Sequence, residues 1–299
     1  MEINAETLEA LRGSLNTSFR DAFDGIESTY LEFATVVPST SGGNHYDWLS
    51  DIPEIREWLD ERQYNTLEEN GYYIPNKDFE ATIRVNRSKI MDGQLGGYTV
   101  IASGLGEKAA QFPDKLSYET LELGWTKLCL TGQNFFDDEH ALMVNGKETT
   151  YSNIQAGTGI SWYLLATGGV VKPILFQDRM KTKFESKGEG SDTAFDRNEY
   201  AFGPWIRAGA GYSFPQLACA SRATLNAANL KALRVRMKAF VDTNGNKRGI
   251  KPTLLIVPSE LEDAARELME AKEIGGVHNT LKGAFTLLVG DRLDGEDHA

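Results

Sequence analysis

The chain has 299 residues, of which 41% are hydrophobic and 25% charged, so it is long enough for two domains or one elaborated core. Its formal net charge of −12 argues against a surface built mainly to grip nucleic-acid phosphates. Cys129 and Cys219 form no CxxC pair, and Met1 to Asn4 lack the basic start of a secretion signal. No apolar run approaches the ~20 residues of a membrane span, so we expect synthesis in a cytoplasm and no membrane partner.

The first segment has the spacing of an amphipathic helix that Asn4 is placed to cap. Its apolar positions recur three or four residues apart at Leu8, Leu11, Leu15, Phe19, Ala22 and Ile26. Such a stripe must dock on another surface, which is more often part of the same chain than a partner. We take Leu11, Leu15 and Phe19 as candidate contacts between subunits. The Ser, Gly and Pro residues of 38–44 predict a loop after this segment.

Residues 72–86 carry two strand signals around a turn. Phe79, Ala81, Ile83 and Val85 alternate with polar residues, and Tyr72, Tyr73 and Ile74 precede a run of turn formers from Pro75 to Asp78. The pattern predicts a β-hairpin. Two strands alone are marginal in water, so we expect another molecule to cover the apolar side. The candidate intersubunit contacts here are Tyr72, Tyr73, Phe79, Ile83 and Val85.

A long broken helix is predicted from Tyr98 to Glu122. Apolar residues recur at helical spacing as far as Pro113, which is tolerated at a helix boundary but not in an interior. Asp114 is placed to cap the second segment.

Short motifs in this part of the chain resemble the Mu-like major head subunit family of tailed phages. They are Trp58-Leu59-x-x-Arg62, Asn76-Lys77-Asp78-Phe79-Glu80, Asp92-x-Gln94-Leu95-Gly96 and Pro113-Asp114-Lys115-Leu116. The resemblance continues through Gly132-Gln133-x-Phe135-Phe136-x-x-x-His140 and covers most of the chain.

The second half reads as short strands followed by a small α/β layer. Apolar runs predict strands at 162–165 and 170–177, a charged loop at 178–196, and strands at 200–203 and 205–212. Asn226 starts a predicted helix, and strands follow at 253–257 and 285–289. Between these strands, Ser259 and Glu262 have the spacing of a capping box.

Several motifs invite chemical interpretations that their context weakens. Residues 104–109 match a Gly-x-Gly-x-x-Ala dinucleotide loop but lack the flanking βαβ pattern, and residues 242–246 imitate only the first half of a calcium loop. Residues 137–140 suggest a cation site or, more simply, a structural loop. The basic residues of 231–238 predict a solvated face or a contact with acids or nucleic acid. We therefore expect no catalytic residue, no cofactor and no metal.

The resemblance implies an α+β tailed-phage major capsid fold of the Hong Kong phage type. In that fold, residues 1–57 would be an N-terminal arm and 58–96 an extended β-hairpin loop. Residues 97–222 would be a peripheral domain with a sheet and a spine helix over 98–122, and residues 223–299 an α/β axial domain.

The function implied by the resemblance is that of a major capsid protein, not an enzyme. Subunits would assemble with themselves into hexamers and pentamers of an icosahedral virion shell that encloses double-stranded DNA without reading its sequence. Further implied partners are a separate scaffolding protein or maturation protease, a portal and a candidate decoration protein. Two alternatives stay open: a cellular nanocompartment shell of the same fold, and a nucleotide-dependent enzyme using the loop from Gly104 to Gly106.

Overall fold

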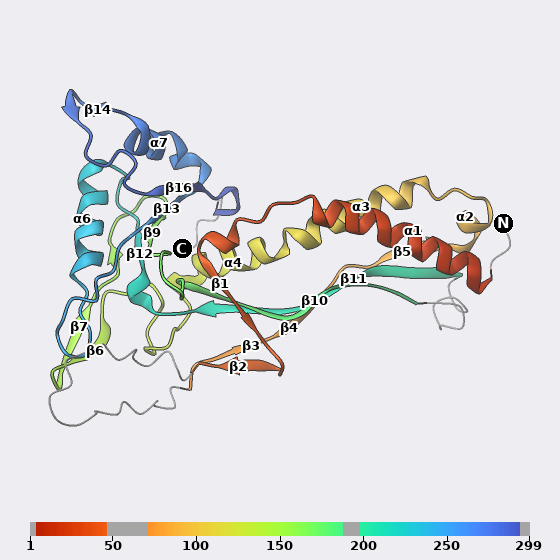
Figure 1. The fold of residues 1–299 in the computed structure, drawn as a ribbon, viewed down its shortest axis with the longest axis horizontal. Helices are drawn as coiled ribbons and strands as arrows, with labels where there is room; N and C mark the ends of the chain where they lie inside the picture. Colours follow the sequence, from red (N-terminus) through yellow and green to blue (C-terminus); the bar gives the residue numbers. More distant parts are fainter. Residues whose placement is uncertain (1–3, 47–70, 188–197, 294–299) are drawn as a thin grey trace.

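The computed structural model describes residues 4–46, 71–187 and 198–293. The molecule is elongated, with a compact block of sheet and helices at one end and a long extension of helices over a ribbon of strands (Figure 1). Within the described residues, no helix is both long and apolar enough to cross a membrane.

The extension is built on one five-stranded sheet, dominated by two strands of 14 residues each that pair antiparallel. One flanking strand runs parallel to the first long strand. Two short strands pair with the second long strand, one after the other along its length. The strands are β1 (Ala34–Pro38), β10 (Ile174–Lys187), β11 (Glu199–Tyr212), β4 (Lys77–Glu80) and β5 (Ile83–Asn86). At Gly203, an added Cβ would lie 2.0 Å from the carbonyl oxygen of Ala81, so this close approach requires glycine.

Three helices cover this sheet (Figure 1). They are α1 (Ala5–Asp24), α3 (Gly96–Ala110) and α4 (Phe112–Glu122), with the single turn α2 (Arg87–Met91) before α3. Asn4 caps α1 as predicted, because its Oδ1 accepts a hydrogen bond from the Thr7 N–H at 2.9 Å. The predicted break in the spine helix is also confirmed, with Pro113 in the first turn of α4. Asp114, however, does not cap α4, whose cap position is Gln111.

A second five-stranded sheet, in the order β16-β13-β9-β12-β8, forms the compact block with two helices. Its elements are β8 (Ile154–Gln155), β9 (Trp162–Leu165), β12 (Ala218–Ser221), β13 (Leu254–Val257), β16 (Thr286–Val289), α6 (Ala227–Ala239) and α7 (Glu262–Glu270). Side chains on one face, such as Leu164 and Leu255, pack under α6 and α7. Those on the other face, such as Tyr163 and Leu165, join the core beneath α4 and β10.

Small paired elements complete the described chain. They are the two-stranded sheet of β2 (Gly43–His45) with β3 (Tyr73–Pro75), and the hairpins of β6 (His140–Val144) with β7 (Lys147–Tyr151) and of β14 (Glu273–Ile274) with β15 (Val277–His278). Short 3-10 turns lie at η1 (Tyr30–Glu32), η3 (Leu123–Trp125), η4 (Pro215–Leu217), η5 (Ser259–Leu261) and η6 (Asp291–Leu293).

Three local predictions are wrong. The predicted hairpin of 72–86 does not form, because β3 pairs with β2 whereas β4 and β5 pair with β11. The charged loop predicted from Asp178 is the second half of β10 as far as Lys187. The helix predicted from Ser259 begins at Glu262, after a 3-10 turn. The motif of 58–62 and residues 47–57 of the predicted arm lie outside the described residues.

Candidate intersubunit surfaces

The apolar stripe of α1 is buried within its own chain. Leu11, Leu15 and Phe19 are at most 5% exposed and pack in one cluster with residues of α3, β5 and β11. In this conformation, α1 thus finds the partner for its stripe inside the subunit. As contacts between subunits, these three residues stay a prediction.

Gly106 allows α1 and α3 to approach closely. An added Cβ at Gly106 would lie 2.2 Å from the carbonyl oxygen of Phe19. Gly104 and Gly106 both lie inside α3, so they form no loop after a strand and the dinucleotide interpretation of this motif is wrong. The sequence signal for the contact was the helical spacing of the small residues Ala102, Gly106 and Ala109, all of which are buried.

The five candidate residues of 72–86 differ in exposure. Val85 is fully buried and Ile83 packs against the same cluster as α1, whereas Tyr73 is 43% exposed and its ring lies tilted against that of His45. Tyr72 Oη accepts a hydrogen bond from the Tyr212 N–H at 2.8 Å. A sister molecule is not needed to cover Ile83 and Val85, because α1 and α3 pack on them within the same chain. Their role between subunits stays a prediction.

Phe79 lies in a groove of about 490 Å³ at the junction of α3 and α4. Its ring centroid is 4.5 Å from that of Phe112, and the groove is also lined by Lys108, Lys115 and Arg292. An aromatic floor with cations at its rim suits an apolar side chain flanked by carboxylates.

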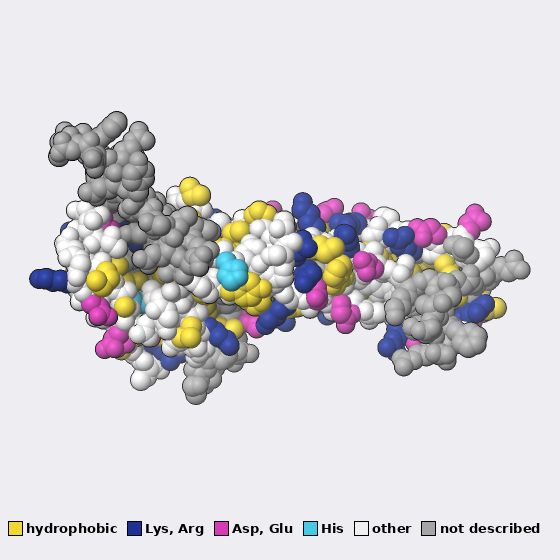
Figure 2. Space-filling model, turned by 90° about the horizontal axis from the view of Figure 1, so that it is seen from below, with side chains coloured by type: hydrophobic (Ala, Val, Ile, Leu, Met, Phe, Trp, Pro, Cys, Tyr) yellow, Lys and Arg dark blue, Asp and Glu magenta, His cyan; other side chains and the backbone are white. Residues whose placement is uncertain are grey.

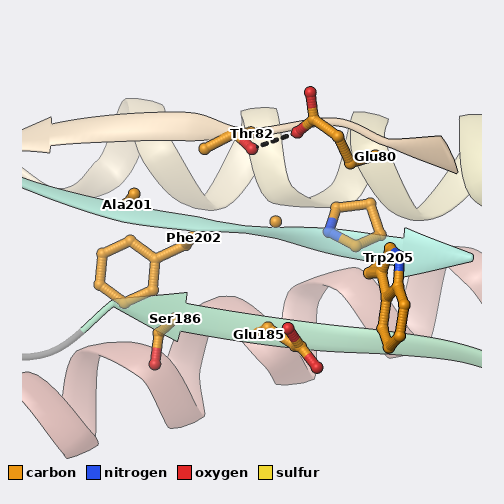
Figure 3. Close-up of a pocket in the computed structure, with 9 residues that line it drawn as sticks. Glu80, Thr82, Glu185, Ser186, Ala201, Phe202 and Trp205 are labelled. Carbon is orange, nitrogen blue, oxygen red and sulfur yellow. Dashed lines mark hydrogen bonds between the residues drawn. The ribbon is translucent and has the colours of Figure 1, made fainter. Parts of the chain in front are cut away.

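A second hollow of about 350 Å³ lies over β11, between β4 and β10 (Figure 3). Glu80 and Glu185 come from the strands on either side, Trp205 lies on β11 between them, and Thr82 donates a hydrogen bond to Glu80. Its lining pairs a hydroxyl with a carboxylate but includes no His, Cys or Lys, so what the hollow offers a partner is shape and hydrogen bonds.

A buried polar network holds β2 and β3 against the long sheet. The side-chain oxygen of Gln177, on β10, accepts hydrogen bonds from the Asn44 N–H and the Tyr46 hydroxyl, each at 3.1 Å. Its amide nitrogen donates to the Ile74 carbonyl at 2.9 Å and to Asn76 Oδ1 at 3.2 Å. Burial also raises the pKa of Tyr46 to about 12, so its hydroxyl stays a donor. Sequence reasoning missed this network, since Gln177 gave no signal beyond its place at the end of an apolar run.

Asp114 anchors the connection that follows α1. Its Oδ1 accepts hydrogen bonds from the backbone N–H groups of Thr29 at 2.9 Å and Tyr30 at 2.7 Å. Burial raises the pKa of the Asp114 carboxyl, and these two donors and nearby Arg292 partly offset that rise. The carboxylate therefore joins the start of α4 to the segment leading into β1.

The loop of 137–140 is held by structural hydrogen bonds. Asp137 Oδ1 accepts from the Glu139 N–H, and Asn153 Oδ1 accepts from the Asp137 N–H. His140 is fully buried with its Nδ1 3.0 Å from Thr131 Oγ1, and burial lowers its pKa. Nowhere in the described chain do three His, Cys, Asp or Glu side chains come together as a metal site would require.

The sequence matches one protein family along nearly its whole length. The profile described as Mu-like prophage major head subunit gpT matches residues 8–293. The major capsid protein of Escherichia phage Mu is 35% identical over 98% of this chain and 100% of its own length. The Mu-like prophage FluMu major head subunit of Haemophilus influenzae is 32% identical, covering 97% of this chain and 99% of its own.

The fold matches solved phage shells. A subunit of the bacteriophage JBD30 procapsid superposes with a TM-score of 0.84 at 36% identity, covering 96% of this chain and 99% of that one. A subunit of the JBD30 capsid decorated with minor capsid protein trimers gives a TM-score of 0.78 at 28% identity, covering 92% and 94%.

Proposed function

Because the chain belongs to the Mu-like prophage major head subunit family and is a major capsid protein of the virion shell, we propose that it closes an icosahedral particle from hexamers and pentamers of itself. The observation that carries this proposal is the match over nearly the full chain to a procapsid subunit, with a TM-score of 0.84. A shell of this kind repeats modest heterologous contacts under symmetry.

Four units would divide the work of assembly: an arm (1–57), an extended loop (58–96), a peripheral domain (97–222) and an axial domain (223–299). The long β10–β11 ribbon under α3 and α4 supports the peripheral unit, and the sheet under α6 and α7 supports the axial one. Since β9 and β12 belong to this second sheet, we extend the axial unit to include them.

The exposed members of the predicted contact set are the ones available to a neighbouring subunit. Tyr73 is 43% exposed, and Phe79 is partly exposed at the groove beside Lys108 and Lys115. A buried contact such as Val85 would reach a neighbour only after the helices packed on it, α1 and α3, moved away.

The wider proposal adds partners that the shell requires. These are a separate scaffolding protein or maturation protease, a portal, enclosed double-stranded DNA and a decoration protein. The decoration protein is supported by the minor capsid protein trimers on the JBD30 shell. A net charge of −12 argues against a strong grip on phosphates, which fits DNA that is enclosed by the shell without being read.

The test is electron microscopy and sedimentation of the expressed chain, alone and with the other head genes of its phage. We expect megadalton particles or free rings of five and six copies. A chain that stays a monomer or small closed oligomer under every one of these conditions would contradict the proposal.

A further inference from the structure

The two helices of the compact block carry opposite charge. Helix α6 has four basic residues and no acidic one, Lys231, Arg234, Arg236 and Lys238. The segment from η5 through α7 has five acidic residues, Glu260, Glu262, Asp263, Glu267 and Glu270, with Arg266 as its only cation. On the face drawn in Figure 2, by contrast, the two signs interleave along the narrow part of the molecule.

The two helices lie on one face of the same sheet but over different strands. Both pack on the face formed by Leu164 and Leu255. Helix α6 contacts β12, and α7 contacts β16, which is an edge strand. Three strand positions separate β12 from β16, or roughly 14 Å at the usual strand spacing. The basic and acidic helices thus flank the block on different sides (Figure 1).

Charges on the outward faces of both helices are unpaired among the described residues. Lys231 and Lys238 are exposed and make no ion pair there, and neither do the exposed acids Asp263 and Glu267. On α7, Arg266 pairs instead with Glu262 at 2.6 Å and Glu270 at 3.2 Å.

The outward face of α6 also has an apolar centre. Val235 is 66% exposed and lies one helical turn from both Lys231 and Lys238. An apolar contact with charges at its rim is the usual make-up of a protein interface.

We propose that α6 of one subunit docks against the acidic η5–α7 face of the next copy, and that this head-to-tail contact closes the rings of the shell. The inference rests on the proposed capsid function and adds the surfaces that meet. Because the two surfaces are different and lie on different sides of one block, the contact is heterologous and propagates around an axis. Complementary charge sets which surfaces meet, while the apolar centre adds burial.

The test uses charge reversals that leave the core untouched. One chain carries Lys231→Glu with Lys238→Glu on α6, and a second carries Asp263→Lys with Glu267→Lys on α7. We expect each to lose particle and ring yield by about tenfold or more, since like charges would face each other at every contact. A third chain with all four changes restores complementarity and should recover assembly.

A matched control carries Lys247→Glu with Lys251→Glu, two exposed cations of the same block outside both helices. It makes the same change in net charge as the α6 variant and should assemble normally. Thermal melting of every variant verifies that the subunit is folded.

Mixing the two single-surface variants gives a sharper readout. In an alternating ring, the reversed α6 of one chain meets the reversed α7 of the other, so every contact is complementary. Only even-membered rings can alternate, so native mass spectrometry should show hexamers but no pentamers.

Assembly of both single-surface variants at normal yield would overturn this inference and leave the proposed function standing, as would failure of the folded four-change chain to recover. Normal assembly combined with lost DNA retention in the α6 variant would assign that helix to nucleic acid and equally overturn it. A wild-type chain that never oligomerises would overturn both this inference and the proposed function.

Discussion

Asp114 was predicted to cap a helix, but in the structure it joins two segments that are distant in the sequence. Replacing it by Ala would leave the N–H groups of Thr29 and Tyr30 without their acceptor. We expect Asp114→Ala to lower the free energy of unfolding by roughly 2 to 4 kcal/mol. Asp114→Asn retains the Oδ1 acceptor and serves as the matched control, with a loss near zero. Denaturant unfolding measures both, and equal stability of the two variants would contradict the anchor.

The same residue predicts a pH dependence with a definite sign. Burial raises the Asp114 pKa above its ordinary 3.8, so the folded chain favours the protonated form more than the unfolded chain does. The stability that the folded chain gains by binding this proton is fully present below the unfolded pKa and is lost as pH rises through the folded pKa. The Tm of Asp114→Asn relative to wild type should therefore be higher at pH 7 than at pH 4. A difference that is constant with pH, or that shrinks as pH rises, would show that burial does not control this carboxyl.

Gly106 offers a second test at single-residue scale. Gly106→Ala places a Cβ 2.2 Å from the Phe19 carbonyl oxygen, so α1 must shift away from α3. We expect a loss of roughly 1 to 3 kcal/mol, measured by thermal or denaturant unfolding. Gly104→Ala is the control, since an added Cβ there meets no atom within 4 Å and should stabilise the helix by up to about 1 kcal/mol. If both substitutions stabilise, α1 does not pack on α3 in solution as described.

At the scale of elements, helices were predictable from the sequence because their signals are local. The cap at Asn4, the break at Pro113 and the start at Asn226 are all where spacing placed them. Strands were recognised by alternation, yet their partners were not. Phe79 and Val85 do lie in strands, but the pairing partner is β11, far along the chain. Alternation reports which face is buried, not which strand lies alongside.

The same limit explains the missed half of β10 and the missed contact network. Residues 178–187 are mostly charged, and only their pairing with β11 makes them a strand. A polar side chain such as Gln177 becomes buried because β2, β3 and the residue that follows each of them approach it. Neither feature leaves a pattern within its own segment.

The Gln177 network can be tested at the scale of elements, because it holds the β2–β3 strand pair on the long sheet. Gln177→Leu keeps the volume but leaves the Asn44 N–H and the Ile74 carbonyl without this partner. We expect a loss of roughly 2 to 4 kcal/mol, with faster hydrogen exchange confined to 43–46 and 72–76. The exposed Gln94→Leu is the control and should change neither measurement. If the variant exchanged faster by the same factor across the whole subunit, the β2–β3 pair would not open independently.

At the scale of the whole molecule, shape and charge divide between the two ends. The extension buries its helix stripes internally and shows interleaved charges, whereas the compact block separates basic α6 from acidic α7 (Figures 1 and 2). An elongated subunit with one charge-polarised end suits rings in which that end meets its copies.

The net charge of the subunit predicts how firmly the shell binds DNA. A subunit with a net charge of −12 offers few clustered cations for counterion release, so DNA should be held weakly. Purified empty particles mixed with linear DNA should co-sediment with it only at low ionic strength and release it between about 50 and 200 mM salt. A neutral polymer of similar length, such as dextran, controls for trapping. Retention that persists well above 200 mM salt and falls steeply only at higher salt would mean that a concentrated basic surface contacts the DNA, and the basic residues of α6 would be the first to test.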